Sequence, residues 1–232
     1  MSYLGVLVLL SLLIVIHEAG HLLAARWMGI PIAGFSVGFG PKLWSRRWGR
    51  VEYSLRWFPL GGFVLPAMDE LEFSSISLRK RLVYFLGGPL ANLTAALPLF
   101  AVLNATEKGL SIYQLFVAPF GQTAAVCRKI LGLLPGMLSP DSIMGVIGIV
   151  VEGGRAGAGM GLYIAISLSL SLAVLNLLPI PILDGGQIVM SCLEEAFPRF
   201  VRLRVPLTLL GLIFLAAVTV YANALDVVRY LS

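Results

Sequence analysis

The two histidines of this chain lie in one five-residue segment, His17-Glu18-Ala19-Gly20-His21. On an α-helix, residues i and i+4 project from the same face, about 6 Å apart along the axis. Two neutral imidazoles at this spacing can bind one zinc ion, and the adjacent Glu18 is then placed to act as a general acid or base on a water molecule. The alternative is that the three polar side chains form a packing patch between helices.

A zinc site of the catalytic type needs a third protein ligand. No histidine remains, and most of the acidic residues lie in loops beside basic residues, as solvated surface groups do. Asp184 differs, because it follows an uncharged run of 28 residues that begins at Ala156, and Pro179 and Pro181 interrupt the helix just before it. Irregular backbone at membrane depth occurs where it is buried in protein or lines a cavity. Asp184 is therefore the candidate third ligand, and the alternative is an N-cap of the following helix.

Membrane-spanning helices must position these residues. The chain has 232 residues, of which 58% are apolar and 12% charged, whereas a soluble domain is about half apolar and a quarter charged. Four apolar stretches are long enough to cross about 30 Å of hydrocarbon, namely residues 3–28, 82–104, 161–178 and 205–225. The sequence predicts an all-α polytopic membrane protein that forms one domain over residues 1–232. Ionisable groups inside the first span are costly to insert and therefore indicate function.

The segments between the spans are of two kinds. In residues 31–66, Val51, Tyr53 and Leu55 alternate with polar residues and several tryptophans lie close by. This pattern predicts a membrane-associated β-hairpin or small sheet, with an ordinary cytosolic hairpin as the alternative. Residues 110–152 combine apolar with basic and amide side chains, which favours interfacial helices. They cross the membrane zero or two times, because a single crossing would separate Asp184 from the histidines.

The net charge of +5 is unevenly distributed. Nine of the 17 lysines and arginines lie between Arg26 and Arg81, and three more lie between Arg199 and Arg204. Positive loops stay in the cytoplasm, so we interpret the basic excess as a topology signal and expect no nucleic-acid partner. It places both termini outside and the active site near the cytoplasmic side. Cys127 and Cys192 fall in separate regions and do not form a disulfide framework.

Two separated motifs resemble a known family. HEAGH in the first span, together with NLLPIPILDGG over residues 176–186, looks like the site-2 protease family of intramembrane zinc metalloproteases, peptidase family M50. FSVGFGPKLW, FPLGGFV, GGPLAN and GVIGIV resemble the bacterial branch that cleaves anti-sigma factors. By this resemblance, His17, His21 and Asp184 bind one Zn²⁺ per chain and Glu18 is the catalytic acid and base.

The resemblance also implies how substrate is held. Asn176 would help to hold an unwound substrate, and the strands around Val51 to Val64 would pair with it. An exposed strand edge at Val51, Tyr53 and Leu55 could supply this backbone pairing. The implied partners are a transmembrane protein substrate and the lipid bilayer, in the inner membrane of a bacterium. The branch usually carries PDZ domains between its second and third spans, but residues 105–154 are too few for one. We therefore expect no PDZ domain in this interval.

We conclude from the sequence that the chain is an intramembrane zinc endopeptidase that hydrolyses peptide bonds in or near transmembrane segments. The alternative is a non-proteolytic membrane scaffold or a metal-binding transporter. Transporters tend to show inverted repeats, and the sequence shows none. A scaffold that has lost its activity should lack an essential residue, whereas His17, Glu18, His21 and Asp184 are all present.

Overall fold

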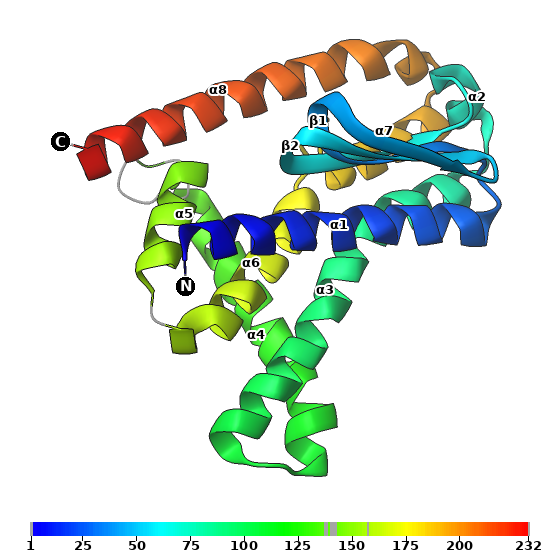
Figure 1. The fold of residues 1–232 in the computed structure, drawn as a ribbon. Helices are drawn as coiled ribbons and strands as arrows, with labels where there is room; N and C mark the ends of the chain where they lie inside the picture. The colour runs from blue at the N-terminus through cyan, green and yellow to red at the C-terminus, as the bar shows by residue number, and fades with distance from the viewer. Residues whose placement is uncertain (1, 137–138, 140–142, 157, 232) are drawn as a thin grey trace. The chain divides into compact units, whose positions relative to one another are not determined.

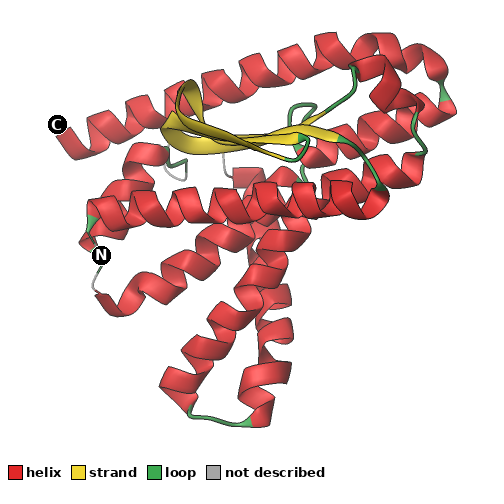
Figure 2. Cartoon of the chain, turned by 45° about the vertical axis from the view of Figure 1, so that its right-hand side comes forward, coloured by secondary structure: helices red, strands yellow, loops and turns green. Residues whose placement is uncertain are grey.

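The computed structural model describes residues 2–136, 139, 143–156 and 158–231. Its elements are α1 (Tyr3–Met28), β1 (Ile32–Trp48), β2 (Val51–Pro66), α2 (Glu70–Ser75), α3 (Leu78–Lys108), the π-turn η1 (Tyr113–Val117), α4 (Ala118–Leu133), η2 (Leu134–Gly136), α5 (Val146–Arg155), η3 (Ala158–Met160), α6 (Gly161–Asn176), α7 (Asp184–Ala196), η4 (Pro198–Leu203) and α8 (Arg204–Leu231). The described chain is mostly helical, with a small two-stranded sheet (Figures 1 and 2).

The chain divides into two compact units. The helical unit comprises Met1–Leu9, Leu93–Val174 and Leu212–Ser232, and the site unit comprises Leu10–Asn92 and Leu175–Gly211. The site unit contains the sheet and both sequence motifs that predict a metal centre.

Within the described part of the chain, three segments are long and apolar enough to cross a membrane: Tyr3–Met28, Leu78–Lys108 and Pro198–Tyr230. They correspond to the predicted first, second and fourth spans. The predicted third span is α6, whose 16 residues extend about 24 Å, somewhat less than the hydrocarbon thickness. The chain is therefore an integral membrane protein with three full-length candidate spans, and the number of four stays a prediction.

The sheet lies where the alternation in residues 31–66 predicts strands. β1 and β2 pair antiparallel, with the turn between Trp48 and Val51. Both strands bend, and Gly38 and Gly40 have φ angles of 89° and 85°, a conformation that glycine adopts without steric cost. Because β1 bends there, its first and last parts pair with opposite sides of the same β2 segment, Glu52–Leu55.

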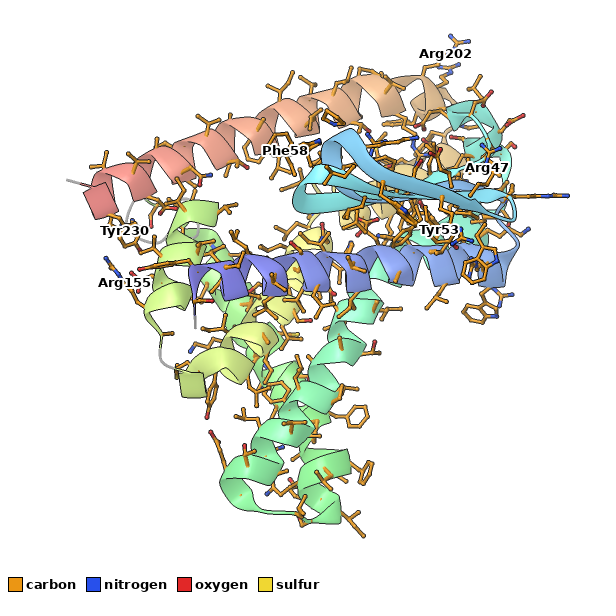
Figure 3. All side chains as sticks on the ribbon, viewed as in Figure 1. Arg47, Tyr53, Phe58, Arg155, Arg202 and Tyr230 are labelled. Atoms are coloured by element: carbon orange, nitrogen blue, oxygen red, sulfur yellow. The ribbon has the colours of Figure 1, made fainter. Side chains whose placement is uncertain are left out.

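The register determines which backbone groups lie at an edge. Glu52–Leu55 pairs with Trp44–Arg47 and also with Gly34–Val37. Gly62–Leu65 pairs with Gly34–Val37 and, among the described residues, with no further strand. Trp44–Arg47 and Gly62–Leu65 are thus the two edges. Figure 3 shows Arg47 and Phe58 at opposite ends of this sheet.

An apolar cluster joins the sheet to the helices of the site unit. Its buried members come from the end of α1, both strands, α2 and the start of α3. Phe73, Tyr84 and Phe85 stack edge to face, with ring centroids 5.2–5.7 Å apart. Such aromatic pairs contribute about 0.5–1.5 kcal/mol each beyond area burial. The Tyr84 hydroxyl also donates to the Val64 carbonyl at 3.0 Å, which connects α3 to the Gly62–Leu65 edge.

Buried charges fix α7. Arg81 of α3 donates to Glu194 at 2.7 Å and to Glu195 at 2.9 Å, and the Arg204 Nε lies 3.1 Å from the second oxygen of Glu194. Arg81, Glu194 and Arg204 are buried. Removing one partner of a buried ion pair typically costs about 3–5 kcal/mol. This network connects α3, the C-terminal part of α7 and the start of α8, and therefore holds α7 in place.

The helical unit has its own core. Ala96, Phe100, Leu103, Ile166 and Leu170 pack between α3 and α6. The side-chain amides of Asn104 and Gln122 exchange two hydrogen bonds, at 2.8 and 3.0 Å, which connect α3 to α4. At 16 and 10 residues, α4 and α5 are shorter than a membrane span. The interfacial placement of residues 110–152 stays a prediction.

Candidate metal centre and active site

The two histidines lie on one face of α1, as their spacing predicts. The Nε2 atoms of His17 and His21 are 3.2 Å apart, and both side chains are buried. The residues of α1 before the motif are mostly leucine, valine and isoleucine, which favour a helix at membrane depth. The packing patch that the sequence left open as an alternative would not require both nitrogens to face the same point.

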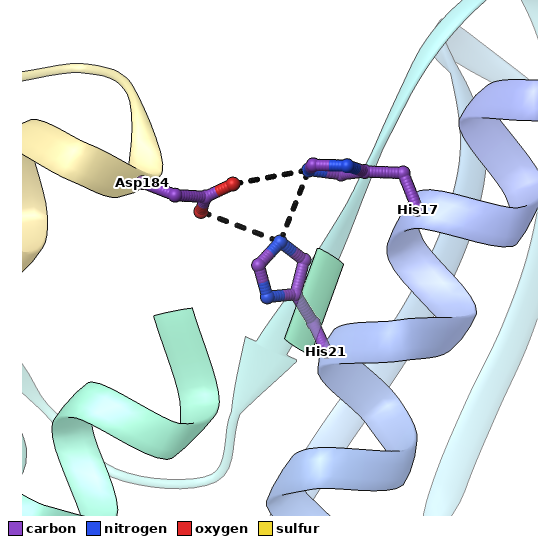
Figure 4. A group of neighbouring side chains, drawn as sticks. All are labelled: His17, His21 and Asp184. Carbon is purple, nitrogen blue, oxygen red and sulfur yellow. Dashed lines mark hydrogen bonds and ion pairs between the residues drawn. The ribbon is translucent and has the colours of Figure 1, made fainter. Parts of the chain in front are cut away.

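Asp184 meets the two histidines from the first turn of α7. Its Oδ2 lies 3.1 Å from His17 Nε2 and its Oδ1 lies 3.3 Å from His21 Nε2 (Figure 4). The N-cap position of α7 belongs to Leu183 and not to Asp184. The alternative reading of Asp184 as a helix cap is therefore wrong.

The two glycines after Asp184 allow this position. Residues 177–183 form an irregular loop between α6 and α7, where Pro179 and Pro181 remove helix donors. A Cβ on Gly185 would lie 2.1 Å from the Leu177 carbonyl oxygen, and a Cβ on Gly186 would lie 2.0 Å from that of Ile180. The loop can therefore fold back over the start of α7 only with glycine at both positions.

These three side chains fit a metal ion. One ligand atom from each of His17, His21 and Asp184 lies within 4.8 Å of the others. Two imidazoles and one carboxylate are a donor set that zinc takes in catalytic sites, where the fourth position stays open for water or substrate. The residues present thus match the predicted zinc site.

Helix α3 contacts the outer side of this cluster. The Nδ1 atom of His21 lies 2.8 Å from the Tyr84 carbonyl oxygen. A carbonyl only accepts, so Nδ1 carries the proton and the Nε2 lone pair faces Asp184, as in metal-binding histidines. One turn later, a Cβ on Gly88 would lie 2.4 Å from His21 Nε2 and 2.5 Å from His17 Nε2. Position 88 therefore has room for a hydrogen atom alone.

Glu18 and the three ligand residues line a common cavity of about 710 Å³. The Gly62–Leu65 edge and Asn176 line the same cavity. Gly62 packs directly against the acid, because a Cβ there would lie 2.8 Å from Glu18 Cγ and from the Ser36 carbonyl oxygen. A strand edge that pairs with no further strand among the described residues thus lies next to the glutamate.

Val51, Tyr53 and Leu55, the strand residues predicted to hold substrate, are not among the residues that line this cavity. Val51 and Tyr53 pack against the apolar cluster of the site unit, and the Tyr53 hydroxyl accepts a hydrogen bond of 2.7 Å from Arg26. Tyr53 and Leu55 are paired on both sides. The expectation that this segment offers a free edge is therefore wrong, because the bend in β1 brings Gly34–Val37 against it.

Sequence reasoning missed two features of the site. It quoted FPLGGFV for its resemblance to a family, and GGPLAN for that resemblance and because its small residues permit close helix approach. The first motif forms the Gly62–Leu65 edge, and the second supplies Gly88 and the helix face behind the histidines. The signal was the pair of adjacent glycines in each motif, since glycine is required where two backbones approach closely.

Apolar helices of spanning length, together with a cluster of two buried histidines and one half-buried aspartate, define a membrane metalloprotein. The sequence profile of peptidase family M50 matches residues 5–218. The chain therefore belongs to peptidase family M50, and the cofactor of this family's metalloproteases is Zn²⁺.

Individual relatives agree with this assignment. The chain is 37% identical over 153 residues to a candidate zinc metalloprotease of Nostoc sp. (59% of this chain, 41% of the relative). It is 40% identical over 163 residues to another of Rhizobium meliloti (58% and 41%). It is 34% identical over 160 residues to the chloroplastic membrane metalloprotease ARASP of Arabidopsis thaliana (63% and 34%). The matched regions thus cover less than half the length of these relatives.

Proposed function

We propose that this protein is an intramembrane zinc endopeptidase that hydrolyses peptide bonds in or near transmembrane segments of membrane proteins. The observation that carries the proposal is the shared cavity. Glu18, the three metal ligands and the Gly62–Leu65 edge line it together. A scaffold or a transporter would need neither a general base nor a strand edge beside its metal ligands. The site therefore favours a protease over these alternatives.

His17, His21 and Asp184 would hold the ion, which supplies a Lewis acid that polarises the scissile carbonyl when bound. Glu18 takes a proton from the attacking water and then passes it to the leaving amine, so that one carboxylate serves both halves of the reaction. Asn176, at the end of α6, lines the same cavity. Its amide can donate to a carbonyl of an unwound substrate and accept from an N–H group.

A peptide bond inside a helix is shielded by the hydrogen bonds of that helix, so the substrate must be extended before attack. We place the backbone pairing that holds an extended substrate at Gly62–Leu65 and not at Val51–Leu55. Addition of a strand to a sheet edge uses main-chain hydrogen bonds and therefore accepts varied side chains.

We further propose that the protein lies in the inner membrane of a bacterium. Its termini would be extracytoplasmic and its active site near the cytoplasmic side, since its basic residues concentrate in the loops after the first and third spans. Anti-sigma-factor-type membrane proteins are the first substrates to test, because several motifs resemble that branch.

The decisive experiment replaces Glu18 with glutamine. The amide keeps the shape of the side chain but cannot accept the proton of water, so cleavage of a single-span substrate should fall by at least about 10²–10⁴-fold. Zinc content should stay at about one ion per chain, because Glu18 is not a ligand. Comparable cleavage by the wild-type protein and E18Q in detergent would contradict the proposed role.

A further inference from the structure

Three residues on one face of α3 lie against the metal centre. Tyr84, Gly88 and Asn92 are spaced by four, so they lie one above the other on the helix. Asn92 is completely buried, and the Nδ2 nitrogen of its side-chain amide lies 3.3 Å from Nδ1 of His17. Helix α3 thus contacts the Nδ1 atom of each histidine. The backbone carbonyl of Tyr84 lies against His21, and the carboxamide of Asn92 lies against His17.

The protonation of the imidazole decides whether the nitrogen or the oxygen of that carboxamide can hydrogen-bond to His17. A neutral imidazole has one N–H, and a histidine that binds metal through Nε2 must carry this proton on Nδ1. The nitrogen and oxygen of an asparagine amide have nearly the same shape, and a half-turn about the Cβ–Cγ bond exchanges them. In the exchanged orientation, Nδ1–H of His17 donates to Oδ1 of Asn92.

We propose that Asn92 is a positioning residue for the metal centre: its side-chain oxygen accepts the Nδ1 proton of His17 and keeps Nε2 directed at the ion. Tyr84 does the same for His21 through its backbone carbonyl, which no substitution can remove. Asn92 is therefore the side chain through which this outer contact can be tested. The proposal rests on the metal centre of the proposed function and not on proteolysis.

Four variants of the full chain separate this role from packing. Asn92→Leu and Asn92→Ala remove the acceptor, with and without retention of volume, whereas Asn92→Asp keeps it. Asn104→Leu is the matched control, because Asn104 is a second buried asparagine of α3 that bonds Gln122 in the helical unit. The zinc dissociation constant is measured by chelator competition in detergent, and thermal unfolding is followed on the same samples.

We expect Asn92→Leu and Asn92→Ala to weaken zinc binding by about 10–100-fold, which is the usual effect of losing such an outer partner. Asn92→Asp should bind zinc within a few-fold of the wild-type protein, and Asn104→Leu should bind it equally well. Wild-type affinity in Asn92→Ala would overturn the proposal, as would an Asn92→Asp variant as weak as Asn92→Ala. Equal losses in the Asn92 and Asn104 variants would assign the effect to helix packing.

These outcomes are independent of the proposed function. If the wild-type protein binds zinc, follows this order of affinities and cleaves no membrane substrate, the endopeptidase proposal fails while the role of Asn92 stands. If E18Q abolishes cleavage but the Asn92 variants bind zinc as the wild type does, the reverse holds.

Discussion

Addition of one methyl group at Gly88 should disable the metal centre. Gly88 lies on α3 against the two histidines, and an alanine Cβ would come within 2.4 Å of His21 Nε2 and 2.5 Å of His17 Nε2. Real Cβ atoms essentially never make contacts below 3.0 Å. The methyl group and the two ligand nitrogens therefore cannot keep their present positions together.

The size of the effect follows from these distances. Ordinary van der Waals contact begins at 3.4 Å, so the imidazoles or α3 must move by about 1 Å, and a displacement of that size typically costs about 10²-fold in rate. A loss of this size corresponds to about 2.7 kcal/mol of transition-state stabilisation. Zinc affinity should fall as well, because the moved atoms are the ligand atoms.

The assay is cleavage of a single-span substrate by Gly88→Ala, with zinc content and thermal unfolding measured on the same preparation. Gly121→Ala in α4 is the control, because no heavy atom of the described residues beyond its own helical neighbours lies within 4 Å of a Cβ at that position. This control should keep activity and zinc, with stability unchanged or raised by up to about 1 kcal/mol. Wild-type zinc content and cleavage in Gly88→Ala would refute the close packing of α3 against the two histidines.

Two further predictions concern the third ligand and the strand edge. Asp184→Ala should lose zinc together with activity, because two imidazoles alone bind the ion far less tightly; an inactive variant with full zinc content by metal analysis would argue for a purely structural Asp184. In a background with Cys127 and Cys192 replaced by serine, and with an added thiol oxidant, Leu65→Cys should form a disulfide with a single-cysteine substrate, whereas Trp44→Cys on the other edge should not. Equal cross-linking at the two edges would contradict substrate pairing at Gly62–Leu65.

The sequence by itself determined the features that depend on neighbours a few residues apart. Apolar runs predicted α1 and α3, because hydrocarbon thickness sets a length that can be counted along the chain. The alternation around Val51–Leu55 predicted strands, because side chains of a strand alternate between its faces. The proximity of His17 and His21 was also predictable from local spacing, since four residues make about one turn of a helix.

The uncharged run and the prolines before Asp184 also made it the candidate third ligand, although it follows His17 by 167 residues, and the family resemblance agreed. Spacing alone left Asp184 as a ligand or a helix cap. The tertiary structure decided between them, because the Pro179–Pro181 loop and the glycines behind it set where α7 begins, and the buried charges of Arg81, Glu194 and Arg204 hold that helix.

Two further features of the site were decided by the tertiary structure alone. A period of two identifies a strand but not its neighbours. The sequence therefore placed the free edge at Val51–Leu55, whereas the bend in β1 leaves it at Gly62–Leu65. Likewise, the GGPLAN motif predicted close helix packing in general, and the structure assigned its glycine and asparagine to the outer side of the histidines. The physical reason is the same in both cases: local periodicity directs a side chain to a face, whereas the partner on that face depends on contacts between segments far apart in the sequence.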